Sequence, residues 1–474
     1  MKPRIIIGAI ACVLAVLFLT GCADNAPVYR VTADPARATL ARTRFQDVEL
    51  NGFEFVVADT HPHRWIPEPG SSNHANRVIA RNMWVENELL LYAITYIEFC
   101  FYNEFPAAML AGDFYSHITI TRAYWAAVNA MRGTVLNMAA IPYFDFFEEY
   151  HWTDFNPFNI LNFHGTIVGK SASFAPQTEA TWMTFFNRRL IEELGLDCPH
   201  ELVFNGEWTF EAMRDMAIAA RADTQGRGIY DRFGMSTNQN FDVTLAMFIA
   251  SGLPMSEWND ELQGFTFSMN NPRHIETVNQ IRQIWQRGVT VADAHYNHNA
   301  FMEGRALFYV SNFRTNDTWM VFDMEDDFGI VPMPMGDAAQ EADRFFNWVY
   351  HHAPSIAVPT TVPDDELWKV AAVMDALAFL AYDEEVVRFQ EMTLSILRDR
   401  ESYFTLSTLI YFGASDFFAI ARFLDMGHDT AFTIGHMMFR DAAHTDPVSE
   451  IARLTGIIET GLRDSVTRLA LHQL

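Results

Sequence analysis

The stretch FFNRRLIEELGLDCPHELVFNGEWTFEAMRDMAIAARADTQGRGIYDRFG, residues 185–234, decides how the rest of the chain is interpreted. Thr209 stands directly before apolar residues at helical spacing, namely Phe210, Met213, Ala217 and Ala220. A threonine side chain there can accept a hydrogen bond from a free amide of the first helical turn, and Glu211 suits the positive end of the helix. A polar loop punctuated by glycines follows at residues 223–231. The pattern predicts a helix, a loop and then another element.

The N-terminus has the order of parts found in an export signal. Lys2 and Arg4 precede an apolar run at residues 5–19, and Leu-Thr-Gly then leads to Cys22. The run is shorter than the roughly 20 residues that a spanning helix needs. The small residues before Cys22 resemble a lipobox, so we expect a lipoprotein signal peptide at residues 1–21 and lipidation of Cys22. The alternative is an ordinary signal peptide with an incidental cysteine.

Acyl chains would hold the protein on a membrane surface without spanning the membrane. Residues 22–44 are small, polar and weakly patterned, and we expect them to form a flexible tether. The expected location is the extracytoplasmic face of the bacterial cytoplasmic membrane. Two further cysteines, Cys100 and Cys198, could pair in an oxidising exterior or remain separate buried thiols.

Composition restricts the class of partner. Half of the residues are apolar and the formal net charge is −26. This charge argues against nucleic acid and anionic headgroups as ligands. A chain of this length is too long for one core and suits two lobes or domains.

The first part of the chain alternates strands and helices. Apolar and alternating runs predict strands at residues 53–59, 93–101 and 114–121, and helical spacing predicts helices at residues 77–91 and 123–131. Strand, helix and strand in this order indicate parallel pairing with right-handed crossovers.

Four blocks of sequence together resemble the family 1 extracellular solute-binding proteins of ABC importers, the sugar-binding branch. The first block is residues 185–234, with Asn-Gly-Glu-Trp-Thr and Asp-x-x-Gly-x-Gly-x-x-Asp-x-x-Gly. The others are AFMEGRALFY at 300–309, FGIVPMP at 328–334 and SIAVP at 355–359. The resemblance covers roughly residues 48–423.

The resemblance implies an α/β, two-lobed, periplasmic-binding-protein-like (type II) fold whose discontinuous lobes are joined by a hinge. We expect lobe I to comprise residues 45–163 and 297–344, and lobe II to comprise residues 164–296 and 345–474. In relatives the strand of the second block returns to the first lobe, and we expect the strand at 355–359 to re-enter the second lobe.

A sugar site needs planar aromatic rings for the faces of the sugar and charged or amide groups for its hydroxyls. Open α/β sheets bind ligands at the carboxyl ends of their strands, and this position selects candidates. They are Trp65 after the first strand, Arg122 and Tyr124 after the third, Gln177 after the passage into the second lobe, Asn238, Asn240, Phe241 and Asp242 before an apolar helix, Arg314 after the 300–309 strand, and Trp348 and Tyr350 before the last crossing. For each residue alone, a packing or solvated role is an equal alternative.

We expect neither a metal site nor a cofactor. In relatives the loop at 223–231 often resembles a calcium loop, but here Gln225 and Arg227 occupy positions that would have to be acidic. The histidine pairs at 61 and 63, 295 and 298, and 351 and 352 lack a matching frame of cysteines or carboxylates. No nucleophile elbow, metalloprotease motif or phosphate-binding glycine loop is present.

The resemblance therefore implies a monomeric, non-enzymatic receptor that binds a mono- or oligosaccharide and delivers it to the permease subunits of an ABC transporter. A surface lipoprotein that senses a ligand for a kinase, or a receptor for peptides or other solutes, is the main alternative. A carbohydrate-active enzyme is a further one, and it would need a pair of catalytic carboxylates that the many acidic residues do not single out.

Overall fold

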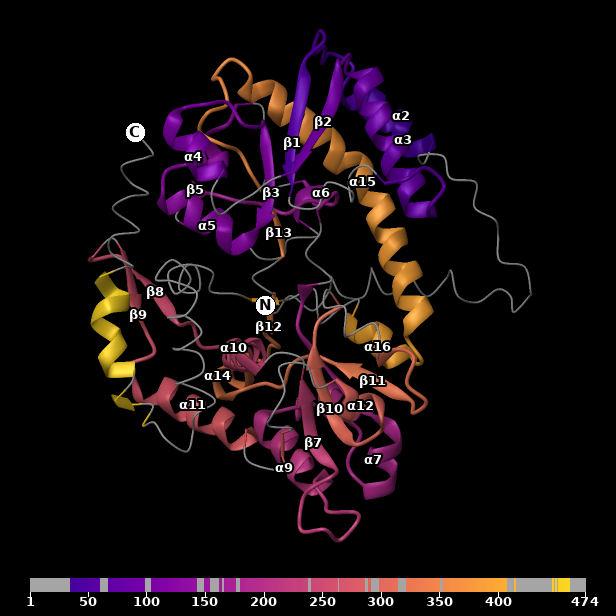
Figure 1. Ribbon diagram of the computed structural model, residues 1–474, viewed down its shortest axis with the longest axis vertical. Helices are drawn as coiled ribbons and strands as arrows, with labels where there is room; N and C mark the ends of the chain where they lie inside the picture. The colour runs from indigo at the N-terminus through magenta and orange to yellow at the C-terminus, as the bar shows by residue number, and fades with distance from the viewer. Residues whose placement is uncertain are drawn as a thin grey trace, which may run out of the picture. The chain divides into compact units, whose positions relative to one another are not determined.

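The computed structural model describes residues 35–59, 67–98, 104–142, 149–153, 162–163, 166–175, 180–237, 240–262, 264–285, 289–290, 298–313, 321–349, 353–406, 413–414, 446, 448–449 and 451–460. Two four-stranded sheets form its framework, and each has its own apolar core. Figure 1 shows the elements of both, with helices packed beside each sheet. Within these ranges no helix combines the length and the apolarity needed to cross a membrane.

The first sheet has the strand order β13-β3-β1-β2. Its strands are β1 (Glu54–Asp59), β2 (Ala93–Glu98), β3 (Ile118–Arg122) and β13 (Pro354–Ala357). β1 pairs in parallel with β2 and β3, and β13 pairs antiparallel to β3. Between the parallel strands run α3 (Asn73–Glu88) and α4 (Glu104–Ala111), and α5 (Ala123–Met131) follows β3. The predicted alternation of parallel strands and helices is confirmed.

The second sheet has the order β11-β6-β10-β7. Its strands are β6 (Met183–Asn187), β7 (Phe233–Thr237), β10 (Ala306–Ser311) and β11 (Phe328–Val331). β10 pairs in parallel with β7 and antiparallel with β6. The helices of this part are α7 (Arg188–Leu194), α8 (Pro199–Asn205), α9 (Phe210–Ala220), α10 (Asn240–Ala250), α11 (Pro272–Ile284), α12 (Asn299–Met302) and α14 (Asp337–Glu341).

The stretch at residues 185–234 folds as its local sequence signals predict. The side chain of Asn187 accepts the amide hydrogen of Leu190 at 3.0 Å and caps α7. α7 ends at Gly195, whose φ of +62° suits a residue without a Cβ. The Thr209 hydroxyl accepts the amide hydrogen of Ala212 at 3.2 Å and caps α9, so the predicted cap is confirmed.

Strand pairing corrects the expected distribution of three strands between the lobes. The strands at 306–311 and 328–331, expected in the first lobe, pair with β6 and β7 in the second sheet. The strand at 354–357, expected in the second lobe, pairs with β3 of the first. All six residues of β10 are buried. The sequence of a strand that is buried on both faces does not indicate the sheet to which the strand belongs.

The expected tether does not extend to residue 44. Residues 35–44 form the helix α2 (Pro35–Arg44), which packs beside α15 (Leu367–Ile396) in Figure 1. Ala41 and Phe45 are buried, and the Arg37 guanidinium makes two hydrogen bonds of 2.7 Å to Asp383. Because its buried positions are small alanines and its arginines are paired, α2 has little apolar signal in sequence. Residues 1–34 lie outside the described ranges.

α15 connects the two parts of the chain. Its first half contributes residues such as Val370 and Leu377 to the core of the first sheet, whereas Ile396 joins the cluster around Phe185 and Phe328 of the second. α16 (Arg400–Phe404) then packs on β11. Shorter elements complete the fold: η2 (Met138–Ala140), α6 (Tyr150–Thr153), β4 (Asn162–Phe163), β5 (Thr166–Ile167), β8 (Ser256–Asn259), β9 (Gly264–Phe267), β12 (Asn347–Trp348) and β14 (Gly413–Ala414).

Candidate ligand-binding edges

The carboxyl ends of the parallel strands in the first sheet bring charged residues to one edge. Asp59 ends β1 and pairs in register with Glu98, which ends β2. Arg122 ends β3 and leads directly into α5. Lys170 bridges to Ile356 of β13, so it extends the same edge. This is the edge at which open α/β sheets bind ligands.

Lys170 is the most deeply buried cation of this edge. Its side chain is 2% exposed, and burial lowers the pKa of its ammonium group to about 8. Lys170 was not among the candidates selected from the sequence, because nothing in its sequence neighbours distinguishes it from a surface lysine. Asp59 was not selected either, although it ends the predicted first strand and the rule of carboxyl strand ends applies to it.

The corresponding edge of the second sheet carries polar side chains and one carboxylate among the described residues. Val310 pairs in parallel with Thr237, so the residues after β7 and β10 lie at one edge. Asn312 and Asp242 are buried there, with Asp242 near the start of α10. Ser311 pairs with Met183, and the start of β6 therefore belongs to the same edge.

Trp348 lies on β12, which comes after the strands of the second sheet in the sequence, and its side chain is fully buried. Its ring stacks on that of Trp182, with centroids 5.6 Å apart and an interplanar angle of 21°. The amide of Trp182 also donates to the Trp348 carbonyl at 2.8 Å. One face of the Trp348 ring, which was predicted to contact the ligand, therefore lies against another indole.

The other predicted contacts divide into three groups. The structure gives full positions for Arg122 and Asp242, on the edges just described. Tyr124, Asn240 and Phe241 lie in the first turns of α5 and α10, where the backbone alone is described. The remaining candidates lie outside the described ranges: Trp65, Gln177, Asn238, Arg314 and Tyr350, together with the lipidation site Cys22. Contact with a ligand remains a prediction for all of them.

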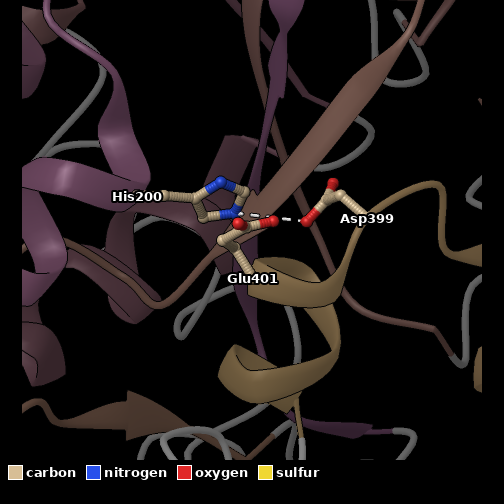
Figure 2. A group of neighbouring side chains, drawn as sticks. All are labelled: His200, Asp399 and Glu401. Carbon is tan, nitrogen blue, oxygen red and sulfur yellow. Dashed lines mark ion pairs between the residues drawn. The ribbon is translucent and has the colours of Figure 1, made fainter.

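One group of side chains has the composition of a metal site. Figure 2 shows His200, Asp399 and Glu401 pointing toward one another, with ligand atoms that all lie within 4.8 Å. The Nε2 atom of His200 lies 3.1 Å from the Ile330 carbonyl oxygen, which can only accept, so Nε2 carries the proton. Burial lowers the pKa of His200 and favours this neutral form.

The carboxylate of Asp399 is engaged as well. Oδ1 accepts the Ser402 amide at 2.6 Å and caps α16, and Oδ2 lies 2.8 Å from an Arg188 nitrogen. Burial works to raise the pKa of Asp399, but the Ser402 amide and the Arg188 guanidinium together hold it below its usual range. The cluster therefore fastens α8, β11 and α16 together, and a metal ion would have to displace these hydrogen bonds.

The loop at 223–231 uses its carboxylates to close itself. Asp223 accepts the amides of Arg227 and Gly228 at 3.0 and 2.6 Å, and Asp231 accepts the amide and hydroxyl of Thr224 at 2.8 and 2.9 Å. The backbone amides of Arg227 and Gly228 hold the pKa of Asp223 below its usual value. Arg227 also pairs with Asp231 at 3.6 Å. These carboxylates stabilise a turn through hydrogen bonds from the loop itself.

Residues 101–384 match the sequence model of the bacterial extracellular solute-binding protein family. The chain belongs to this family. The match covers more than half of the chain and includes all four blocks of sequence that carry the resemblance. No curated protein sequence matches the chain.

Three solved structures share the fold. An ABC substrate-binding protein of Listeria monocytogenes, Lmo0181, solved with cycloalternan, is 12% identical with a TM-score of 0.53 over 86% of this chain and 98% of its own. UspC of Mycobacterium tuberculosis is 16% identical with a TM-score of 0.53 over 86% and 100%. The GacH receptor of Streptomyces glaucescens, solved unliganded and with acarbose, is 14% identical with a TM-score of 0.51 over 87% and 99%. The two-lobed type II fold predicted from sequence is confirmed for this solute-binding protein.

Proposed function

We propose that this solute-binding protein captures a carbohydrate between its two lobes and delivers it to the permease of an ABC transporter. The observation that carries the proposal is the pair of strand edges, one charged around Asp59, Arg122 and Lys170, the other polar around Asn312 and Asp242. Carboxylate, guanidinium and amide groups are the donors and acceptors that sugar hydroxyls require. Likeness in fold to proteins solved with cycloalternan and acarbose supports the choice of ligand class.

We further propose that the predicted contacts other than Trp348 touch the ligand, and that Asp59 and Lys170 join them. Sugar binding would favour the closed arrangement of the lobes by selecting among arrangements that exist without ligand. Lipidation of Cys22 would keep the monomeric receptor on the extracytoplasmic side, near its permease. The protein would act by binding and release, without catalysis.

A thermal-shift screen against mono- and oligosaccharides tests the ligand class, because a ligand that binds the folded state raises the melting temperature by mass action. The sugar that gives the largest shift is then titrated by calorimetry into wild-type protein and Arg122→Ala. We expect at least a tenfold loss of affinity, equal to about 1.4 kcal/mol. Arg132→Ala, at the other end of α5, is the matched control and should bind as the wild type does.

The outcomes separate the alternatives. A shift with peptides and none with any sugar would replace the carbohydrate by a peptide ligand. Release of a shortened product from an oligosaccharide would make the protein an enzyme. Incorporation of an alkynyl fatty acid into the wild-type protein, absent from Cys22→Ala, tests the anchor. Co-purification of the lipidated protein with permease subunits rather than with a sensor kinase tests the transport role.

A further inference from the structure

A second group of polar and aromatic side chains lies at the opposite, amino-terminal edge of the first sheet. The turn at residues 50–52, the start of β1 and the residues around the start of α15 line an open depression with a volume of about 510 Å³. Six of its lining residues define what we name the Phe53 pocket: Phe53, Glu54, Phe114, His117, Glu366 and Lys369. At ~3.3 Å per residue of strand, Asp59 at the other end of β1 lies roughly 17 Å from Glu54. The pocket is thus separate from the proposed interlobe site.

A rigid imidazole forms the floor of the Phe53 pocket. His117 is 4% exposed, and its Nδ1 atom accepts the amide hydrogen of Val56 at 2.8 Å. The ring proton is therefore on Nε2, which lies 3.3 Å from Oε2 of Glu366. The rings of Phe53 and Phe114 pack edge-on against the imidazole at centroid distances of 4.7 and 4.8 Å. These contacts hold the imidazole in place, with its Nε2–H directed at the Glu366 carboxylate.

The remaining groups of the pocket stay open to solvent. The side chain of Glu366 is 28% exposed, and Phe114 is 47% exposed. Glu54 is exposed as well and uses one carboxylate oxygen to accept the Thr95 hydroxyl at 2.7 Å. The Lys369 ammonium lies 5.1 Å from the centroid of the Phe53 ring. A ligand would therefore meet two acceptors, one donor and an aromatic surface.

This combination selects among classes of ligand. An anion would face two carboxylates on a chain of net charge −26. A cation would compete with Lys369, which already occupies the favourable position near the Phe53 ring. An apolar ligand would bury charges without giving them partners. Hydroxyl groups both donate and accept, and the C–H faces of a sugar ring can pack on Phe114.

We propose that the Phe53 pocket binds a neutral mono- or disaccharide unit at a second site, which the proposed transport function does not use. Its volume falls within the range of about 300–1,000 Å³ that is usual for small-molecule pockets. The acceptors Glu54 and Glu366 would receive hydroxyl hydrogens, Lys369 would donate to a ring or hydroxyl oxygen, and Phe114 would cover one face of the sugar. A longer glycan could be held here while another sugar occupies the interlobe site.

Saturation-transfer difference NMR with glucose, maltose, cellobiose and maltotriose tests the proposal on the full mature chain. In the Arg122→Ala background the interlobe site is weakened, and the part of the sugar signal that depends on Phe114 and Glu366 reports the pocket. When Phe114→Ala and Glu366→Gln are added to this background, the sugar affinity obtained by titrating that signal should fall at least tenfold. Leu110→Ala is the matched control, because Leu110 is 84% exposed and does not line the pocket. The melting temperature of each variant checks that it is folded.

Equal sugar signals with and without the Phe114 and Glu366 changes would overturn the proposal, as would the absence of any signal in the Arg122→Ala background. The two sites can fail independently. Sugar binding that is lost with Phe114→Ala and Glu366→Gln but unaffected by Arg122→Ala would support the pocket and contradict the interlobe function. Binding that is lost with Arg122→Ala alone would do the reverse.

Discussion

His117 accepts the amide hydrogen of Val56 through Nδ1 at 2.8 Å, and the imidazole that makes this contact is almost fully buried. Burial lowers the pKa of His117, and the nearby Lys369 ammonium lowers it further. The carboxylates of Glu366 and Glu54 act in the opposite direction, but the pKa stays below its usual value. In the unfolded chain the same group takes up a proton at a pKa of about 6.5. The stabilisation by neutral His117 is therefore complete above that pH and is lost as the pH falls through it toward the lower pKa of the folded protein.

We accordingly expect a lower melting temperature at pH 5.5 than at pH 7.5. Burial lowers the pKa values of His200 and His274 in the same direction, and each such group contributes at most about 1.4 kcal/mol per pH unit. Replacing His117 by Asn should lower stability at pH 7.5 and reduce the difference between the two pH values. Equal pH dependence in the wild type and in His117→Asn would contradict the assignment.

A buried carboxylate holds α2 to the body of the protein. Oδ1 of Asp375 accepts His151 at 2.7 Å and the Trp152 indole at 3.2 Å, and Oδ2 accepts Arg44 at 2.8 Å. Asp375→Ala would leave the buried donors of His151 and Trp152 without their acceptor, and we expect about 3–5 kcal/mol less stability. Urea denaturation measures this loss. Glu303→Ala, which changes an exposed acid in a local pair with Arg305, should be within about 0.5 kcal/mol of the wild type.

The same network predicts how far the N-terminus can be shortened. Removal of residues 1–34 should leave the melting temperature unchanged, because α2 begins at Pro35. Removal through residue 45 should lower it clearly, since Ala41 and Phe45 are buried and Arg37 and Arg44 are paired across to α15. Equal melting temperatures for the two truncated chains would show that α2 adds nothing to the fold.

Local signals in the sequence predicted the elements well and the assembly of the sheets less well. The cap at Thr209 and the parallel order around β1 depend on neighbouring residues, which the sequence displays directly. β10 belongs to the second sheet because it pairs with buried strands that are distant in the sequence. The hydrophobic pattern of β10 does not indicate which strands are its partners. For the site, the rule of carboxyl strand ends placed Arg122 and Asp242 on sheet edges. Lys170 was missed, because its burial arises from strands distant in sequence.

Gly234, the last residue of the 185–234 stretch, lies where the structure leaves no room for a side chain. A Cβ added there would lie 2.3 Å from the carbonyl oxygen of Ala217 in α9, which is backbone and cannot move aside cheaply. We expect Gly234→Ala to cost at least the roughly 1–3 kcal/mol that overpacking a core costs. Gly456 is the matched control, because a Cβ there meets open space within a helix, and Gly456→Ala should stabilise by up to about 1 kcal/mol. Chemical denaturation of both variants gives the comparison, and a neutral effect of Gly234→Ala would contradict the close approach of β7 to α9.

Substitutions of Trp348 distinguish a packing role from ligand contact at the carboxyl edge of the second sheet. Its ring is fully buried and stacks on Trp182 at 5.6 Å, so we expect Trp348→Ala to cost about 3–5 kcal/mol. Trp348→Phe keeps an aromatic ring in the stack and should leave sugar affinity within about twofold of the wild type, or ~0.4 kcal/mol. Calorimetry with the best sugar of the thermal-shift screen measures this affinity, and denaturation measures the stability of the same sample. If Trp348→Phe instead lowers sugar affinity tenfold at unchanged stability, the ring contacts the ligand, and the second sheet must open a path to it when the sugar binds.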